Sequence, residues 1–194
     1  MPNYAVLTND LQLDCITKNQ ARIDSVTRSR PAMAEFLRSM RELKVPIFHL
    51  QLIHEIGDKH VELHEGVIPT LRGTPGAEIL EDMYAPGDIV VEKRKDSGFF
   101  ETTLDGQLKE HHIDTVIIMG MQTQICVQTT AADAYFRGYE ILVPEDAVVS
   151  TREEDKQRAL GWLASYCAII TSTSDILHHV RNDISYNFSV IATP

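Results

Sequence analysis

The segment Thr115-Val-Ile-Ile-Met-Gly-Met-Gln-Thr-Gln-Ile-Cys-Val127 decides the fold of this chain. Its first five residues are continuously apolar and rich in β-branched side chains, which predicts a strand buried inside a parallel sheet. Residues 124–137 contain no Gly or Pro, so they predict a helix that ends before Gly138. Cys126 is therefore expected in a strand-to-helix turn. Unpaired N–H groups and the helix dipole favour a thiolate there and are expected to lower the thiol pKa.

Apolar runs alternate with longer helical patterns along nearly the whole chain. This alternation predicts one domain, residues 1–194, with a three-layer α/β/α fold: a single, mostly parallel six-stranded sheet with helices on both faces. Residues 51–87 form an irregular stretch that is too long for an ordinary connection, which is typical of functional or interface loops. The predicted strands are residues 5–9, 46–50, 88–92, 115–119, 139–143 and 168–171, and the predicted helices are residues 25 or 30 to 43, 104–111, 124–137 and 152–165.

Composition limits the classes of partner. The net charge of −10 argues against a nucleic-acid surface and against an anionic membrane surface, since both recruit clustered Lys and Arg. No apolar run approaches the roughly 18 residues of a membrane helix, and the N-terminus does not resemble a leader. Three widely spaced cysteines without a CxxC pair are typical of reduced thiols. We expect a soluble, cytoplasmic protein that acts on a small molecule.

Three polar residues lie at the ends of predicted strands. Asp10, Lys93 and Cys126 follow the first, third and fourth strands, and ligands of open α/β sheets bind beyond these carboxyl ends. The carboxylate can accept the thiol proton, and the ammonium can hold the carboxylate ionised. Each residue also has an ordinary explanation: a turn-forming Asp, a Lys in a solvated basic run with Arg94 and Lys95, and a small buried Cys. The three together are much more specific than any one of them.

At this point the chain resembles the isochorismatase-like cysteine hydrolases, and the resemblance covers nearly its whole length. The matching motifs come from the first strand, the middle segment, the nucleophile turn and the end of the fifth strand. They are Asp10-Leu-Gln12, Gly73-Thr-Pro-Gly-Ala-Glu78, Pro86-Gly-Asp88, Lys93-x-x-x-Ser97-Gly-Phe99, Gly120-x-x-Thr-x-x-Cys-Val127, Ala134-x-x-x-Gly-Tyr139 and Asp146-Ala147.

The resemblance implies an α/β hydrolytic site with defined roles. It implies a catalytic triad of Asp10, Lys93 and Cys126. It also implies a cis peptide at Met121–Gln122, which would aim the backbone N–H groups of Gln122 and Cys126 at a developing oxyanion. Gln51, Ser97 and Phe99 are further candidates for the wall of the substrate pocket, and Phe99 is equally typical of a core residue.

Metal binding is not expected. Nicotinamidase-type members of the family carry an Asp-x-His pair after the second strand, whereas residues 49–54 here read His-Leu-Gln-Leu-Ile-His. His60 and His64 have helical i, i+4 spacing, so a site built from histidines of this loop is the alternative; a polar loop near the substrate or a subunit contact is the other. We expect neither a metal nor another cofactor.

The predicted activity is cleavage of a C–N bond in an amide, ureide or carbamoyl compound, through a thioester on Cys126. Carrier-linked isochorismatases lack this cysteine, because breaking a vinyl ether requires no acyl-enzyme. Ether cleavage by Asp10 and Lys93 is the first alternative. The second is a non-catalytic binding protein with the same fold, which would have no need of all three groups.

The C-terminal tail predicts self-association. After Ile176 it contains several apolar residues, more than a free terminus normally exposes. We expect a homodimer or homotetramer, and packing of the tail within its own chain is the alternative. The residues concerned are Ile184, Tyr186, Phe188, Val190 and Ile191.

Overall fold

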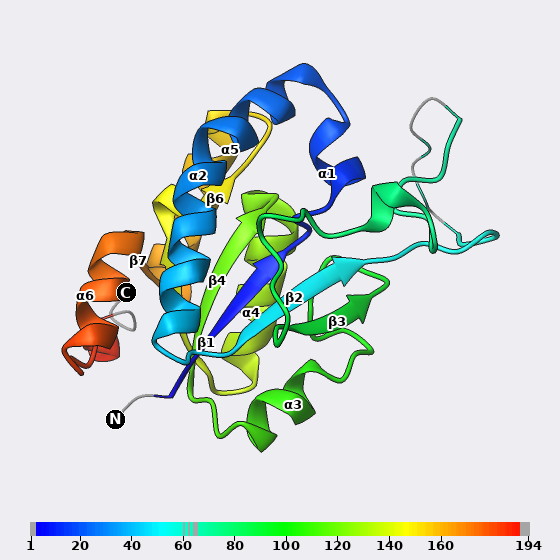
Figure 1. Cartoon of the computed structure of the whole chain (residues 1–194). Helices are drawn as coiled ribbons and strands as arrows, with labels where there is room; N and C mark the ends of the chain where they lie inside the picture. The colour runs from blue at the N-terminus through cyan, green and yellow to red at the C-terminus, as the bar shows by residue number, and fades with distance from the viewer. Residues whose placement is uncertain (1–2, 60, 62, 64–65, 191–194) are drawn as a thin grey trace.

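The computed structural model of the chain describes residues 3–59, 61, 63 and 66–190. In this part the strands form one parallel sheet in the order β3-β2-β1-β4-β5-β7, with β6 paired to β4 (Figure 1). The strands are β1 (Tyr4–Asn9), β2 (Ile47–Leu52), β3 (Ile89–Lys93), β4 (Thr115–Met121), β5 (Glu140–Pro144), β6 (Val148–Val149) and β7 (Ile169–Thr171). The sheet thus has seven strands instead of the predicted six, and the additional strand is the two-residue β6.

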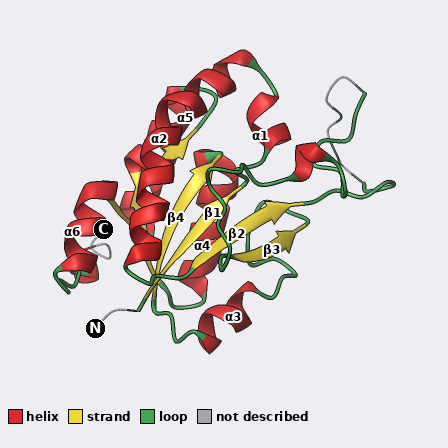
Figure 2. Ribbon diagram, viewed as in Figure 1, coloured by secondary structure: helices red, strands yellow, loops and turns green. Residues whose placement is uncertain are grey.

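Helices cover both faces of the sheet, which confirms the predicted three-layer fold (Figure 2). One core cluster joins α2 (Gln20–Glu42) and α6 (Thr173–Arg181) to side chains such as Val6; the other joins α3 (Leu104–Glu110), α4 (Gln128–Phe136) and α5 (Glu153–Tyr166) to side chains such as Ala5 and Leu7. Neighbouring residues of β1 therefore point to opposite cores, as the two-residue period of a strand requires. A short helix, α1 (Leu13–Thr17), follows β1. None of the described helices has the length and apolar content needed to cross a membrane.

The order of the strands indicates where a ligand would bind on the sheet. β1 lies between β2 and β4: the chain adds β2 and β3 on one side of β1 and then crosses over to add β4, β5 and β7 on the other side. In open α/β sheets the crevice at this reversal, beyond the carboxyl ends of the strands, is where ligands bind. Asn9 and Met121 end the two strands on either side of it.

Gly120 allows these two strands to approach each other closely. It pairs with Asn9 and has φ +104, a left-handed conformation that favours glycine. A Cβ at this position would lie only 2.3 Å from the Asn9 carbonyl oxygen. A residue with a side chain would force β1 and β4 apart.

A buried polar network fixes the start of β3 to β2 and α2. Arg41 Nε and Nη2 donate to the two carboxylate oxygens of Asp88 at 3.0 and 2.7 Å, and His49 Nε2 lies 3.0 Å from Oδ2. Because an ionised carboxylate only accepts, His49 donates through Nε2 and accepts the Thr8 hydroxyl through Nδ1, at 2.7 Å. Burial alone would raise the pKa of Asp88, but the hydrogen bonds from His49 and Arg41 outweigh it and hold the pKa well below its usual range.

We predict that Asp88→Asn lowers the free energy of unfolding by about 2–3 kcal/mol at neutral pH, the range of hydrogen bonds to charged groups. A depressed Asp pKa contributes stability that is present above the unfolded value, about 3.9, and is lost as pH falls through the folded value. The difference between wild type and variant should therefore persist down to about pH 4 and shrink in more acid solution. Urea denaturation across this range measures it.

Asp82→Asn is the matched control, because Asp82 pairs with Arg30 in an exposed ion pair. Removal of that pair should cost less than about 1 kcal/mol. A deficit of Asp88→Asn that is equally small, or that does not change on acidification, would contradict the assigned role of the network.

The C-terminal tail packs partly on its own chain. The sequence pattern did not predict helix α6. Ser172 caps this helix by accepting a hydrogen bond from the Asp175 N–H. Tyr186 stacks on His179 with 4.0 Å between ring centroids, and Tyr186 and Phe188 pack against the core on the α2 side. Of the remaining predicted tail residues, Ile184 is exposed, the Val190 side chain is not described, and Ile191 lies outside the described residues. Self-association stays a prediction.

Candidate active site

The structure brings Asp10, Lys93 and Cys126 together at the carboxyl edge of the sheet. Asp10 directly follows β1 and adopts φ 52, a left-handed conformation that Asp tolerates better than most residues. Lys93 is the last residue of β3, one position inside the strand rather than after it. Cys126 belongs to a single π-helical turn, η2 (Thr123–Val127), between β4 and α4. All three side chains are buried, with Lys93 wholly inaccessible.

Lys93 connects the carboxylate to the segment that follows β3. Its Nζ donates to Asp10 Oδ2 at 3.2 Å and lies 3.0 Å from Oδ1. It also donates to the backbone carbonyls of Lys95 and Asp96, at 3.1 and 3.0 Å. The three ammonium protons thus have three acceptors, which is the full donor capacity of a lysine. This arrangement fixes the carboxylate and the 95–96 segment relative to each other.

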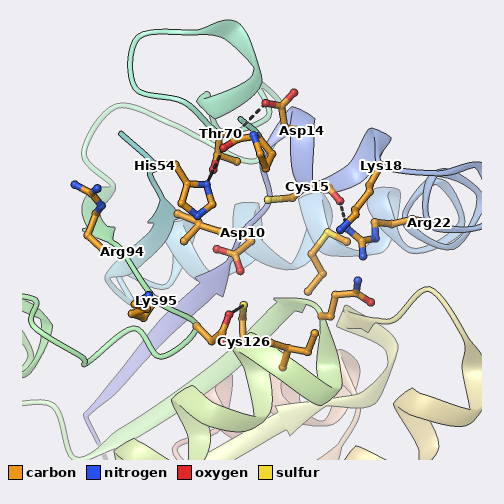
Figure 3. A pocket seen from close by; sticks show the side chains of 16 residues that line it. Asp10, Asp14, Cys15, Lys18, Arg22, His54, Thr70, Arg94, Lys95 and Cys126 are labelled. Carbon is orange, nitrogen blue, oxygen red and sulfur yellow. Dashed lines mark hydrogen bonds between the residues drawn. The ribbon is translucent and has the colours of Figure 1, made fainter. Parts of the chain in front are cut away.

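The Cys126 thiol faces two carboxylates. Its Sγ donates its single proton to Asp96 Oδ1 at 3.7 Å, and it is close enough to Asp10 for the two groups to influence each other's pKa. Figure 3 shows Asp10 and Cys126 pointing toward one another across the same cavity. Asp10 is therefore in position to take the thiol proton.

The pKa of the Cys126 thiol is raised well above its usual range, not lowered as the sequence suggested. Burial is the largest cause, the negative charge of Asp10 is the next, and Lys93 opposes both. Burial likewise raises the pKa of Asp10, although Lys93 acts against it. The pKa of Lys93 is raised, because the attraction of Asp10 and Cys126 outweighs the effect of burial. At rest the site therefore holds a protonated thiol beside the paired side chains of Asp10 and Lys93.

A cavity of about 320 Å³ opens above these residues (Figure 3). Its volume suits a small molecule. Lys18 and Arg22 lie on one side of it, and Arg94 and Lys95 lie on the other. The acidic side chains that line it are Asp10, Asp14 and Asp96, and His54, Thr70 and Cys15 complete its polar wall.

The peptide bond between Met121 and Gln122 is cis, and both residues line the cavity with Cys126. The Gln122 side chain points elsewhere: its Oε1 accepts the Thr151 N–H at 3.0 Å. The backbone at 121–126 therefore borders the space in front of the thiol.

The residues predicted for the pocket wall do not line this cavity. Gln51 donates through Nε2 to the Ala77 carbonyl at 2.8 Å. Ser97 donates to a carboxylate of α4. Phe99 is only 4% exposed and stacks on Tyr139 in the core, at 5.9 Å between ring centroids.

The histidines considered as metal ligands have other partners or are not described. His49 belongs to the Asp88 network, and His54 Nδ1 lies 2.7 Å from the Pro69 carbonyl oxygen. His60 and His64 lie outside the described residues. Among residues 3–59, 61, 63 and 66–190, no three His, Cys, Asp or Glu side chains are grouped as metal ligands would be. Metal independence stays a prediction.

Several residues of the site were not predicted from the sequence. Gln12 is fully buried, and its amide donates to the Leu52 and Ala77 carbonyls, at 2.8 and 2.7 Å. These two hydrogen bonds connect the end of β2 to the irregular stretch 51–87. Asp96 could have been found as an acidic residue near the end of a functional strand. Cys15 and Arg22 could not, because α1 and the start of α2 were not predicted.

Comparisons with known proteins identify the family to which the chain is similar. A family model described as the isochorismatase domain matches residues 4–175. The uncharacterised isochorismatase family protein YddQ of Bacillus subtilis (strain 168) is 28% identical over 162 residues, covering 78% of this chain and 82% of that protein. The ureidoacrylate amidohydrolase RutB of Pantoea ananatis (strain LMG 20103) is 38% identical over 88 residues, covering 41% of this chain and only 35% of that protein.

A solved structure extends the likeness over most of the chain. N-carbamoylsarcosine amidase from Thermoplasma acidophilum superposes with a TM-score of 0.75 at 28% identity, covering 89% of this chain and 97% of that one.

Proposed function

Because the chain belongs to the isochorismatase family, we propose that it is a cysteine-dependent hydrolase that cleaves a C–N bond of a small amide, ureide or carbamoyl compound. Asp10, Lys93 and Cys126 act as one unit in this reaction. The observation that supports it most is the buried thiol facing the Asp10–Lys93 ion pair at the floor of a small cavity.

The reaction begins with transfer of the thiol proton. Because the thiol is protonated at rest, Asp10 accepts its proton as Cys126 Sγ attacks the substrate carbonyl. The raised pKa of Asp10 makes it a stronger base for this step. Asp10 then gives the proton to the leaving nitrogen, the C–N bond breaks, and a thioester remains on Cys126. A water molecule, deprotonated by the same carboxylate, releases the acid and restores the thiol.

Lys93 and the backbone stabilise the charges that develop. The ammonium keeps Asp10 ionised between proton transfers and offsets the negative charge of the attacking sulfur. The backbone N–H groups of Gln122 and Cys126 are proposed to donate to the oxyanion; one such donor is typically worth about 2.7–4 kcal/mol in the transition state.

The names of similar proteins favour an amide over an ether. RutB is a ureidoacrylate amidohydrolase, and the Thermoplasma acidophilum protein is an N-carbamoylsarcosine amidase. Ether cleavage would use Asp10 and Lys93, but the Cys126 thiol would have no catalytic role in it. A binding protein would have no use for a buried ion pair directed at a thiol.

Release of amine from a panel of primary amides, ureides and carbamoyl compounds tests the proposal. We expect ammonia or a small amine from at least one class of compound, together with an acyl adduct on Cys126 in the intact mass after acid quench. Isochorismate, which has no C–N bond to break, is the control substrate. Cleavage of isochorismate, with no amine from any compound of the panel, would mean that the ether reaction is the correct one.

A further inference from the structure

A second carboxylate, Asp96, lies at the nucleophile and has no part in the reaction described above. Its Oδ1 accepts the Cys126 thiol at 3.7 Å, and its side chain lines the cavity. Its backbone is anchored, because the Asp96 carbonyl oxygen accepts Lys93 Nζ at 3.0 Å. Asp96 is therefore held beside the sulfur by the same lysine that holds the base.

The charges around Asp96 indicate that its carboxylate needs a hydrogen-bond donor during the reaction. The Asp10 carboxylate is paired with the buried ammonium of Lys93, whereas the Asp96 carboxylate accepts its hydrogen bond from the Cys126 thiol. Once Cys126 gives up its proton to Asp10, Asp96 loses its hydrogen-bond donor and faces a developing anion on sulfur. A donor placed between the sulfur and Asp96 at that moment would relieve both the lost hydrogen bond and the repulsion.

The substrate of an amidohydrolase supplies such a donor. An attacked carbonyl carbon lies next to the sulfur, and the nitrogen bonded to that carbon is one bond farther away. The 3.7 Å between Sγ and Asp96 Oδ1 places the carboxylate within reach of an N–H on this nitrogen.

We propose that Asp96 is a specificity-determining residue that accepts a hydrogen bond from the amide nitrogen of the substrate, and so selects a carbonyl compound whose scissile nitrogen carries an N–H. This inference rests on the proposed hydrolase function. In the complex, the substrate N–H takes the place of the thiol as the donor to Asp96, and the thiol turns to Asp10. An ester or a dialkylamide offers no N–H, so it leaves Asp96 facing the sulfur anion without a donor.

The expected effect of Asp96 on substrate selection is modest. Asp96 is exposed at the mouth of the cavity, so water replaces part of a missing hydrogen bond and salt screens its charge. Fully buried sites can reject a substrate that lacks a donor by about 10⁴-fold, and we expect about tenfold here. Its exposure also means that substitution should not unfold the protein.

The first test measures the contact between Asp96 and the thiol without any substrate. Alkylation of Cys126 by iodoacetamide is followed from about pH 6 to about pH 10 by peptide mapping, so that Cys15 and Cys167 are scored separately. Asp96→Asn removes a negative charge beside the sulfur and should make alkylation about three- to tenfold faster near neutral pH, with a smaller difference at high salt. Asp24→Asn removes the same charge from an exposed position on α2 and should match wild type. Equal rates in all three proteins would overturn the proposal.

The second test measures selection of the substrate. The probes are the primary amide that the panel identifies as the fastest, the N,N-dimethylamide of the same acid, and its methyl ester. Asp96→Asn should lower kcat/KM for the primary amide about tenfold and change that for the ester less than about threefold. Asp96→Glu, which keeps the charge, should recover part of the preference for the primary amide. An unchanged ratio of amide to ester in Asp96→Asn would overturn the proposal alone. Absence of amine release by the wild type would overturn the proposed function as well.

Discussion

Cys126→Ala should lower turnover by about 10⁴-fold or more while the protein stays folded. The size follows from the behaviour of catalytic groups that act as a unit, in which loss of the nucleophile removes the covalent route altogether. Asp10 and Lys93 keep each other as partners, so no buried charge is left alone. The removed sulfur leaves only a small cavity, worth about 1 kcal/mol. Amine release and thermal unfolding of the same preparation measure the two quantities.

Cys167→Ala is the matched control for this experiment. Cys167 is buried to a similar extent, but it lies in the core on the α4–α5 side and does not line the cavity. The two variants should lose similar stability, and only Cys126→Ala should lose activity. If Cys126→Ala kept more than about a tenth of wild-type turnover, Cys126 would not be the nucleophile and ether-type hydrolysis would become the better explanation.

Lys93→Met should abolish activity and also destabilise the protein by about 3–5 kcal/mol at neutral pH, the usual cost of removing one partner of a buried ion pair. Without the ammonium, burial raises the pKa of Asp10 further. A carboxyl group that is protonated at rest cannot accept the thiol proton. The stability deficit should shrink as pH falls, because a protonated Asp10 needs no counter-ion. Denaturant unfolding at several pH values, together with amine release, measures both effects.

The double variant Lys93→Met/Asp10→Asn separates the two consequences. It removes both charges, so at neutral pH it should be more stable than Lys93→Met. It should remain inactive, because Asn cannot act as a base. A single variant with wild-type stability, or a double variant that is less stable than the single one, would show that the ion pair does not govern folding in this way.

The sequence predicted the core of the fold because its strands are short apolar runs buried on both faces. It placed the start of α2 wrongly. Ser25, Arg30 and Pro31 resembled the beginning of a helix, but the helix begins at Gln20, with Asn19 accepting the Arg22 N–H as the cap. Pro31 lies inside the helix. Polar residues on the exposed face of this long helix look like a loop when they are read without their buried neighbours.

The sequence placed Asp10, Lys93 and Cys126 at one edge, because parallel strands bring their carboxyl ends together. It could not predict the electrostatics. The expected lowering of the Cys126 pKa considered the start of the helix, but it did not consider burial or the negative charge of Asp10. The residues predicted for the pocket wall differ from those observed for a similar reason. Gln51 and Phe99 contact other parts of the chain instead of lining the cavity, and the direction of a side chain at the end of a strand depends on packing that only the structure shows.

Gly120 limits how this protein can change over generations. A mutation that adds a side chain there has no room, because the obstacle is the backbone of Asn9 and not a flexible side chain that a second mutation could shorten. The same two strands carry Asp10 and lead into the turn that holds Cys126, so such a mutation would separate the reacting groups as well as disturb the sheet. Descendants can therefore acquire new substrates by altering the exposed mouth of the cavity, whereas this glycine has to be inherited unchanged. In a randomised library selected for activity, we expect every survivor to carry glycine at this position.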